Sequence, residues 1–524
     1  MPLFTRLDPF ARVEATPREG FWACTGLGLL FFGLLYGVPT FFSYPYADHD
    51  YYFSITEVYR QMWVEHGRPL SLSWLFGGGV WLPGLAQFPG TSPGVLMAVV
   101  LGTVGGQISW TILQLSLGCG FAYGLLRAWG CNHRGAAIGA VVFWCSPWLI
   151  RHLADGHLPW AGFCFPLALA WLMVDGTKTR PIPLALAALA AAWLMVLSTP
   201  LQGVFYGLPL LAGAAIYGFR RDARSTLVVL LCLVAVLGMH LDFYLQALEG
   251  FELYQRSQLL HLQDEKFIGN SGAGTLMLRT LVGLGVPFVG YGYHAEGNLL
   301  AFLPLLFAVG LRPSKALGAL LIASLVLGLI PSVGPIRQMD RMLWVFLLLV
   351  GLHCGRNEAQ ISPRALRASL AILASIAASM MALRWVMQPL SPLEERSSPA
   401  GIVGVAIPSA NHPLQDHHVE GVFRSIRQGL VAPRPSAHVI VPTFPGSVDG
   451  ALTDDERFQV SGHDGHLIVK GPFAEGQGVT LSLRGDEYLR RHLHTPSPAR
   501  FEEDDGRLRV VATQSTDRVE VLSR

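Results

Sequence analysis

Charge is scarce in this chain. Asp, Glu, Lys and Arg make up 14% of the 524 residues, whereas soluble domains carry about 25%, and 51% of the residues are hydrophobic. The scarcity is uneven, because the first 400 residues hold 45 charged residues and the last 124 hold 29, roughly 11% against 23%. An ordinary soluble core is therefore excluded for the first part, and a lipid environment is excluded for the last.

Excess positive charge and paired cysteines are also missing. The formal net charge is only +2 and there is no long basic patch, which argues against a nucleic-acid-binding protein. All seven cysteines lie in the apolar part, up to Cys354, and no Cys-x-x-Cys pair occurs, so the polar part has no disulfide framework and no thiolate metal site. Walker, Gly-x-Ser-x-Gly and His-Glu-x-x-His motifs are absent as well.

The first 390 residues contain a series of apolar runs. The first, residues 21–42, follows three arginines and is too long for the core of a signal peptide, so we expect an uncleaved transmembrane helix with residues 1–20 in the cytoplasm. The further runs are 107–128, 135–150, 159–176, 182–199, 201–219, 225–246, 296–311, 316–331, 341–354 and 366–388. The sequence thus predicts an α-helical polytopic membrane domain over residues 21–390, with about 11 transmembrane helices.

Lys and Arg are concentrated in short loops between these runs. These residues are Arg127 and Arg134; Lys178 and Arg180; Arg220, Arg221 and Arg224; Arg312 and Lys315; and Arg356, Arg364 and Arg367. With eleven helices and a cytoplasmic N-terminus, all of these loops are cytoplasmic, as the positive-inside rule requires. The odd number puts the polar C-terminal part on the extracytoplasmic side.

With the same eleven helices, residues 43–106 are expected to form a first extracytoplasmic loop. Within it, Ile55–His66 has apolar residues on one helical face, so this segment is expected to lie along the outer membrane surface. The apolar stretch Met97–Leu101 fits either a re-entrant or interfacial helix or a true span.

The character of the chain changes after Pro392. Residues 391–435 are rich in Pro, Ser and His and are expected to form a linker. Residues 436–524 are expected to form a small all-β extracytoplasmic domain. Its predicted strands are His438–Val441, His466–Val469, Val479–Leu483, Leu508–Ala512 and Val519–Leu522.

Two carboxylates, Asp48 and Asp50, stand just beyond the outer end of the first helix. At the rim of a membrane such a pair is suited to catalysis, because one group can accept a proton from a hydroxyl while the other orients it or binds a divalent cation. Asp48 and Asp50 are thus also the candidate metal ligands, with Mg²⁺ or Mn²⁺ as the ion. The simpler alternative is that charged residues follow a transmembrane helix because they are in water.

A second group of ionisable residues lies in an exported turn between two apolar helices: Arg151, His152, Asp155 and His157. Ionisable groups at membrane depth are costly and usually face a partner, an aqueous cavity or a substrate. Arg151 is suited to a phosphate, the histidines to hydrogen bonding or metal ligation, and Asp155 to orienting them. The alternative is an ion pair between Arg151 and Asp155 that closes the turn.

A third group, Tyr293, His294 and Glu296, stands just before the next apolar run. Aromatic rings with His and Glu at an outer entrance are suited to binding a sugar or an acceptor, although aromatic residues at a membrane interface need no ligand.

Together these features resemble the GT-C superfamily of polytopic membrane glycosyltransferases, in the branch that uses polyprenyl-phosphate sugars. The resemblance rests on Asp48-His49-Asp50 in a long first exported loop, on the helix Ile55–His66 and on the many-helix body with an exported C-terminal domain. Phe88-Pro89-Gly90-Thr91-Ser92-Pro93 and the turn Arg151–His157 look like those of the YfhO-like branch.

The resemblance implies a glycosyltransferase, of hexosyl or pentosyl type, in a bacterial inner (cytoplasmic) membrane. Asp48 would be the general base on the acceptor, Asp50 would support it or hold a metal, and Arg151 or His152 would meet the departing carrier phosphate. The implied partners are a polyprenyl-phosphate sugar, membrane lipid and a glycan or glycolipid acceptor, with no nucleic acid. The sequence has no Trp-Trp-Asp motif, which argues against protein N-glycosylation.

Two other functions stay open at this point. A transporter or flippase for a lipid-linked saccharide is expected to show paired halves and charged or broken helices near the bilayer midplane, and the sequence has neither. A non-catalytic assembly subunit, whose β-domain binds a partner outside the membrane, fits the sequence if the acidic pair is dispensable.

Overall fold

The computed structural model describes most of the helical part and the C-terminal strands. The described residues are 16–38, 40, 52–53, 56, 59–60, 62–64, 67–69, 72–73, 80–81, 89–154, 156–175, 180–245, 282, 298–310, 313–329, 332–333, 336–337, 343–386, 455, 457–463, 466–484, 490, 493–504 and 507–523. Two compact units divide the chain. One comprises Met1–His49, Ile108–Leu241 and Leu260–Pro389, and the other Asp50–Gln107, Asp242–Leu259 and Leu390–Arg524.

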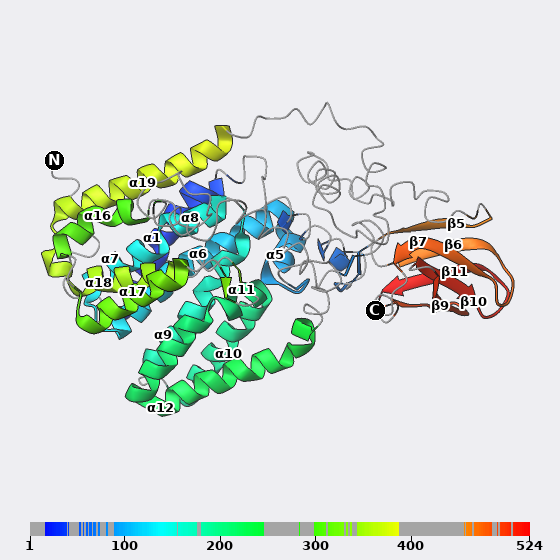
Figure 1. The fold of residues 1–524 in the computed structure, drawn as a ribbon, viewed down its shortest axis with the longest axis horizontal. Helices are drawn as coiled ribbons and strands as arrows, with labels where there is room; N and C mark the ends of the chain where they lie inside the picture. Colours follow the sequence, from blue (N-terminus) through cyan, green and yellow to red (C-terminus); the bar gives the residue numbers. More distant parts are fainter. Residues whose placement is uncertain are drawn as a thin grey trace. The chain divides into compact units, whose positions relative to one another are not determined.

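The first unit is helical (Figure 1). Its elements are α1 (Pro17–Phe32) with the π-helix η1 (Gly33–Gly37), α6 (Thr103–Ala128, whose first turn belongs to the second unit), α7 (His133–Trp144), α8 (Pro147–Ala154), the 3₁₀-helix η3 (Leu158–Phe163), α9 (Cys164–Asp175), α10 (Pro181–Ser198), α11 (Pro200–Phe205), α12 (Leu208–Met239), α16 (Asn298–Val309), α17 (Lys315–Leu329), the strand pair β3 (Ser332–Val333) and β4 (Ile336–Arg337), α18 (Leu343–Arg356), the 3₁₀-helix η7 (Glu358–Gln360) and α19 (Pro363–Val386).

Among the described residues, six helical segments are long and apolar enough to cross a membrane: Pro17–Gly37, Thr103–Ala128, His133–Ala154, Leu158–Asp175, Pro181–Ser198 and Leu208–Met239. Shorter apolar helices follow at Leu299–Val309, Lys315–Leu329 and Leu343–Arg356. The expectation of a helical, multi-pass membrane protein is therefore confirmed, and the number of eleven helices stays a prediction.

Helix α12 contains a break at the basic loop that the sequence predicts between residues 219 and 225. Asp222 has an extended backbone (φ −156°, ψ 93°), and its Oδ1 accepts hydrogen bonds from the backbone N–H groups of Arg224 and Ser225 at 3.1 and 3.4 Å. This is the geometry of an N-cap, so a second helix begins here in a new direction.

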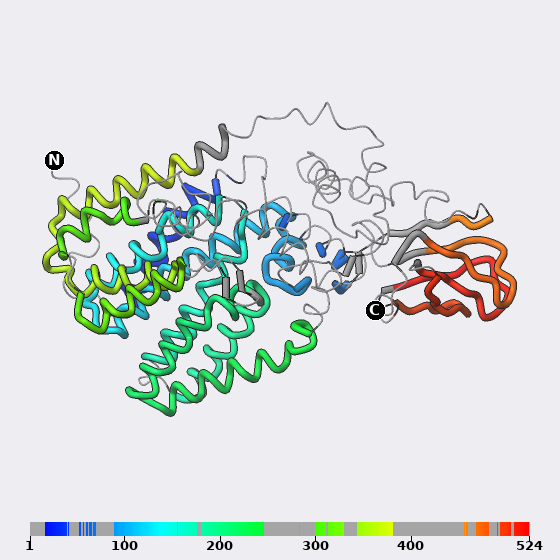
Figure 2. The backbone as a smooth tube through the Cα atoms, viewed as in Figure 1, coloured from blue at the N-terminus to red at the C-terminus, as the bar shows by residue number. Residues whose placement is uncertain are grey.

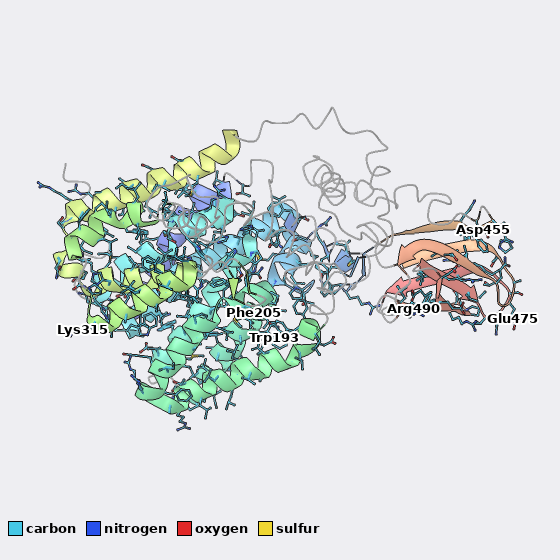
Figure 3. All side chains as sticks on the ribbon, viewed as in Figure 1. Trp193, Phe205, Lys315, Asp455, Glu475 and Arg490 are labelled. Carbon is cyan, nitrogen blue, oxygen red and sulfur yellow. The ribbon has the colours of Figure 1, made fainter. Side chains whose placement is uncertain are left out.

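Apolar side chains cover the outside of these helices as well as their interior. Ile182, Leu231 and Phe307 are 74%, 59% and 71% exposed. Trp193 on α10 and Phe205 on α11, labelled in Figure 3, are also exposed. A helix that is apolar all round belongs in a low-dielectric solvent, so these outer faces fit contact with lipid chains.

Basic loops of the first unit meet at one end of its helices, called the basic end below. Arg221 Nη1 in α12 donates to the carbonyl oxygen of Ala128 at the end of α6, at 3.0 Å. Arg356 Nη2 at the end of α18 donates to the carbonyl oxygen of Trp129, at 2.9 Å. Three basic loops that the sequence assigns to one side of a membrane therefore lie together, as that assignment requires.

Helices α7 and α18 approach each other closely through glycines. A Cβ atom at Gly139 would lie 2.6 Å from the carbonyl oxygen of Gly351, and one at Gly135 would meet the carbonyl oxygen of Gly355. Each helix thus carries a Gly-x-x-x-Gly pair, the pattern that lets apolar helices pack backbone to backbone in a membrane.

In the second unit, the segment predicted to lie on the membrane surface is packed against protein. Where described, residues 52–64 are helical, with Tyr59 and Met62 buried. Trp63 Nε1 donates to the carbonyl oxygen of Gly90 at 2.8 Å. The apolar face of this helix therefore contacts the chain itself, since a pattern of apolar residues does not distinguish protein from lipid as its partner.

Helix α5 (Pro93–Leu101) resolves the alternatives for its segment. Nine residues span about 14 Å, too short to cross a bilayer, so a true span is excluded. The Ser92 side chain caps its N-terminus, Gly102 (φ 75°) ends it, and Gly106 then packs on the backbone of Ala98. The chain thus forms a helical hairpin with the start of α6.

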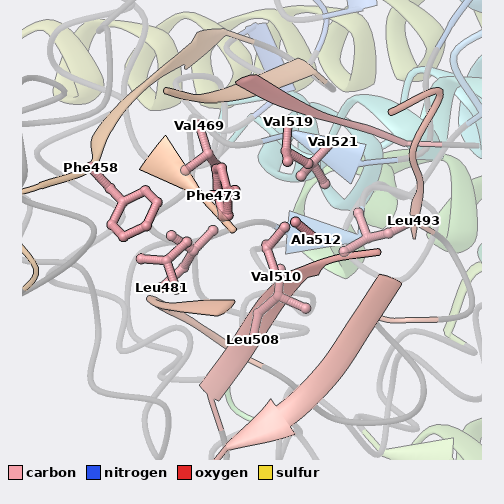
Figure 4. Close-up of a cluster of buried hydrophobic side chains, with 11 residues drawn as sticks. Phe458, Val469, Phe473, Leu481, Leu493, Leu508, Val510, Ala512, Val519 and Val521 are labelled. Carbon is pink, nitrogen blue, oxygen red and sulfur yellow. The ribbon is translucent and has the colours of Figure 1, made fainter. Parts of the chain in front are cut away.

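The C-terminal strands form two antiparallel sheets, at the orange and red end of the chain in Figure 2. They are β5 (Gln459–His463), β6 (His466–Phe473), β7 (Gly478–Arg484), β8 (Leu493–His494), β9 (Ala499–Asp504), β10 (Arg507–Ala512) and β11 (Thr516–Ser523). The sheet orders are β7-β10-β9 and β5-β6-β11-β8. Inward side chains of both sheets, including Leu481, Val510 and Val521, make one buried core (Figure 4), which defines a β-sandwich.

The predicted strands at His466–Val469, Val479–Leu483, Leu508–Ala512 and Val519–Leu522 correspond to β6, β7, β10 and β11. The predicted strand His438–Val441 lies outside the described residues. A further short pair, β1 (Leu72–Ser73) and β2 (Val80–Trp81), lies within residues 43–106, the loop that the sequence predicts to be extracytoplasmic.

Candidate functional site

Two predicted site residues are brought together between α7 and α9. Pro147 begins α8, where its missing N–H costs nothing, and Gly156 (φ 86°) supplies the left-handed turn after it. The backbone N–H of His157 then donates to the carbonyl oxygen of His152 at 2.8 Å. This local fold turns the two imidazole rings toward each other.

The two histidines form a hydrogen-bonded pair. His152 Nδ1 and His157 Nδ1 are 2.8 Å apart, so one nitrogen carries the proton and the other accepts it. Two nitrogens bound to one tetrahedral metal ion at about 2.0–2.1 Å are more than about 3 Å apart. The observed distance therefore fits a shared proton rather than a shared metal ion.

Aromatic rings enclose His152, which is fully buried. The Trp160 ring centroid lies 4.5 Å and the Trp148 ring centroid 4.7 Å from that of His152. The ring centroid of Trp160 is also 4.7 Å from that of Phe163 and 5.3 Å from that of Tyr206, which lies between α11 and α12. His157 and Tyr206 are only half-buried, so this Trp–His cluster has one side near the surface.

Arg151 lies on α8 next to the buried histidine and is half-buried. A guanidinium group has the fork of donors that matches the oxygens of a carboxylate or a phosphate. Asp155, the residue expected to orient or pair with it, lies outside the described residues.

Buried polar side chains stand beside the Trp–His cluster. A Cβ at Gly162 of η3 would lie 2.6 Å from Thr199 Cγ2 and 3.5 Å from Gln114 Nε2, so α6, η3 and the α10–α11 junction meet closely here. Within the described part of the chain, Gln114 Nε2, Ser146 Oγ and Ser198 Oγ are buried without a hydrogen-bond partner. Such atoms usually bind ordered water or a ligand.

The sequence reasoning missed these polar residues and the enclosing tryptophans. A usable signal was present, because Gln107, Thr111 and Gln114 recur at helical spacing in an otherwise apolar run, and all three are buried. A polar stripe along a transmembrane helix indicates a cavity or a partner.

The other predicted site residues are not described by the structure. Asp48, Asp50, Tyr293, His294 and Glu296 lie outside the described residues. In the part of the chain that the structure does describe, no three His, Cys, Asp or Glu side chains are grouped as metal ligands. The metal site at Asp48 and Asp50 stays a prediction.

The sequence and the fold can be compared with those of known proteins. No protein-family model and no curated protein matches the sequence. Among solved structures, the chain is similar to the arabinofuranosyltransferase AftD from Mycobacteria, determined by cryo-electron microscopy, with a TM-score of 0.41 and 16% sequence identity. The match covers 71% of this chain but 27% of that one, so this chain spans about a quarter of its length.

Proposed function

We propose that this protein is a multi-pass membrane glycosyltransferase. It takes a sugar from a polyprenyl-phosphate-linked donor and transfers it to a glycolipid, polysaccharide or other glycan acceptor on the extracytoplasmic face. Such a donor carries its tail in lipid and its sugar phosphate at the membrane rim. Apolar outer helix faces beside a cluster of Arg151, His157 and aromatic rings at the ends of those helices fit both halves of that donor.

The observation that carries the proposal is the direction of the first helix. Gly20 near its start lies against Tyr123, whose hydroxyl group is 2.6 Å from Nδ1 of His133 near the basic end. Gly37 at the end of η1 lies against Ile112 in the other half of α6. The chain therefore leaves η1 at the end of the helices that is opposite the basic end. Helix α7 begins at the basic end, so it also reaches this opposite end, where α8 follows. The segment with Asp48 and Asp50 follows from there.

In the proposed reaction, the acceptor hydroxyl oxygen attacks the anomeric carbon and the bond to the carrier phosphate breaks. Asp48 takes the hydroxyl proton, and Asp50 supports it or holds Mg²⁺ or Mn²⁺. Arg151 stabilises the charge that develops on the departing phosphate, with His157 as a second donor. Because His152 is fully buried, its role is to hold His157 in position.

The remaining candidates belong to binding rather than to the chemical step. Tyr293, His294 and Glu296 are proposed to contact the sugar or the acceptor, since aromatic faces and hydrogen-bonding groups suit a pyranose or furanose ring. Asp155 is proposed to orient Arg151 or one of the histidines.

Two variants of the full chain test this function. Asp48→Asn is expected to abolish transfer, by at least about 100-fold as for loss of a general base, while donor binding and abundance in the membrane stay normal. Arg151→Ala is expected to weaken donor binding, because a phosphate contact is lost. Both are measured with the purified protein, a polyprenyl-phosphate sugar and a glycan acceptor, and Arg364→Ala at an exposed site after η7 serves as the matched control. Normal glycoconjugate from cells that carry only Asp48→Asn contradicts the catalytic assignment, and unchanged donor affinity in Arg151→Ala contradicts the phosphate contact.

A further inference from the structure

Three arginines from three different helices converge on one turn at the basic end. The turn, Ala128–Cys131, connects α6 to α7. Arg127 Nη1 donates to the carbonyl oxygen of Cys131 at 2.5 Å. As described above, Arg221 donates to the carbonyl oxygen of Ala128 and Arg356 to that of Trp129. The carbonyl groups at the end of α6 carry the negative end of its helix dipole, which attracts the three guanidinium groups.

These guanidinium groups keep most of their donors. Each has five N–H groups, and each uses one nitrogen on the turn. In the described part of the chain, none of the three forms an ion pair with Asp or Glu; Glu358, the carboxylate nearby, instead pairs with Arg134 at 3.3 Å. Arg221 and Arg356 are exposed. The guanidinium groups of Arg221 and Arg356 therefore lie at the surface without a carboxylate partner among the described residues, and Arg127 is half-buried beside the same turn.

The positive charge of this cluster acts on the neighbouring Cys131 thiol. Burial raises the pKa of the Cys131 thiol to about 11, and Arg356 and Arg127 act in the opposite direction on the same group. Two guanidinium groups from different helices thus lie close enough to Cys131 to act on it together.

The depth and the neighbours of the cluster indicate its ligand. The turn lies between the candidate spans Thr103–Ala128 and His133–Ala154, which is the level of lipid headgroups. On α12, just before Arg221, Ile216 and Phe219 are 62% and 44% exposed. These two side chains offer apolar surface to the acyl chain of a lipid, and Arg221 beside them is placed to contact its headgroup.

We propose that Arg127, Arg221 and Arg356 bind the phosphate of an anionic phospholipid in the leaflet at the basic end. Forked guanidinium donors suit phosphate oxygens, and basic pockets between transmembrane helices bind such headgroups. The lipid then ties α6, α12 and α18 together at this end. The site is independent of sugar transfer and of the acidic pair.

The test uses the purified full chain in a neutral detergent, titrated with phosphatidylglycerol, phosphatidylcholine or inorganic phosphate while the thermal midpoint Tm is followed. Phosphatidylglycerol is expected to raise Tm. The double variant Arg221→Gln/Arg356→Gln is expected to need about 30-fold more phosphatidylglycerol for the same rise, at about fivefold per arginine near the headgroups. The matched control Arg180→Gln/Arg364→Gln removes the same charge from exposed positions of other basic loops and is expected to keep the wild-type response.

A second double variant distinguishes loss of the lipid site from a general loss of folding. Arg221→Lys/Arg356→Lys keeps the charge and removes the forked donors, so it is expected to fold normally and respond weakly to phosphatidylglycerol. An equal loss of response in the Arg180/Arg364 control overturns the site. A Tm rise of the same size with phosphatidylcholine also overturns it, and the same rise with inorganic phosphate identifies free phosphate, not lipid, as the occupant. None of these outcomes depends on transferase activity.

Discussion

His152 and His157 differ in what their side chains contact, although the sequence presents them as two equal histidines in one turn. His152 is enclosed by Trp148 and Trp160 and is fully buried, whereas His157 is half-buried and joined to it by the shared proton. A fully buried ring between two indole rings contributes packing, whereas the half-buried ring of His157 lies partly at the surface. The two residues are therefore expected to respond differently to substitution.

We predict that His152→Ala destabilises the protein by about 3 kcal/mol, because it leaves a cavity between two indole rings. His157→Ala is expected to cost about 1–2 kcal/mol, since its ring is partly in solvent already but its loss removes a hydrogen bond from the buried His152. Thermal unfolding in detergent measures both. In a transfer assay, His157→Ala is expected to lower activity although its loss of Tm is the smaller of the two, so equal losses of Tm in the two variants contradict these separate roles.

At this scale the sequence indicated a candidate turn, and it could not predict which of the turn's side chains are buried and which lie near the surface. Four ionisable residues between two apolar helices are visible without a structure. The burial of His152 depends on Trp160 and Tyr206, and the contact with Tyr206 joins segments far apart in the chain. Gln114 and Ser198 join the same region through the packing of α6 on the α10–α11 junction, which no local pattern encodes.

Among the helical elements, α7 and α18 depend most directly on the absence of side chains. Their paired glycines bring backbone against backbone, and no hydrophobic effect favours this contact in lipid. Close packing and the absence of a Cβ are therefore what hold the two helices together.

Gly139→Leu is expected to destabilise the protein by about 2–3 kcal/mol, because its Cβ would meet the carbonyl oxygen of Gly351 and the helices must separate. Gly213→Leu on α12 is the matched control, since a Cβ there meets nothing within 4 Å. Both changes put leucine into an apolar helix, so differences in helix propensity cancel. Thermal unfolding in one detergent compares them, and similar Tm values for the two variants contradict the proposed packing.

The elements themselves follow from the sequence to different degrees. Apolar runs gave the helices of the first unit, and the charged loop at residues 220–224 marked the break that Asp222 makes within α12. Strands β6, β7, β10 and β11 were predicted from short runs rich in β-branched residues. Strand β9 was not predicted, because its sequence, Ala-Arg-Phe-Glu-Glu-Asp, is mostly charged. Pairing with β10, the central strand of its sheet, stabilises β9, and pairing is not a local property.

Over the whole molecule, the uneven distribution of charge corresponds to two kinds of structure. The helical unit exposes apolar side chains, and the C-terminal sandwich buries its apolar residues in a core of its own and exposes charge. The contacts of Arg221 and Arg356 join basic loops at one end of the helices, which the positive-inside rule assigns to the cytoplasm. With the predicted odd number of crossings, the sandwich is expected on the extracytoplasmic side.

The predicted topology is tested with short epitopes inserted in the full chain after Gly130, after Gln360 and after Arg524. Gly130 (φ 94°) lies in the turn of the arginine cluster, and Gln360 ends η7, so both positions are at the basic end. We expect antibody to reach the epitope after Arg524 in intact spheroplasts, and the other two only after permeabilisation, because three arginine-bearing loops are retained on the cytoplasmic side. Access to all three epitopes on the same side means an even number of crossings before the sandwich. Access to Gly130 and Gln360 alone in intact spheroplasts means that the whole orientation is reversed, and this second result removes the proposed site from the extracytoplasmic face.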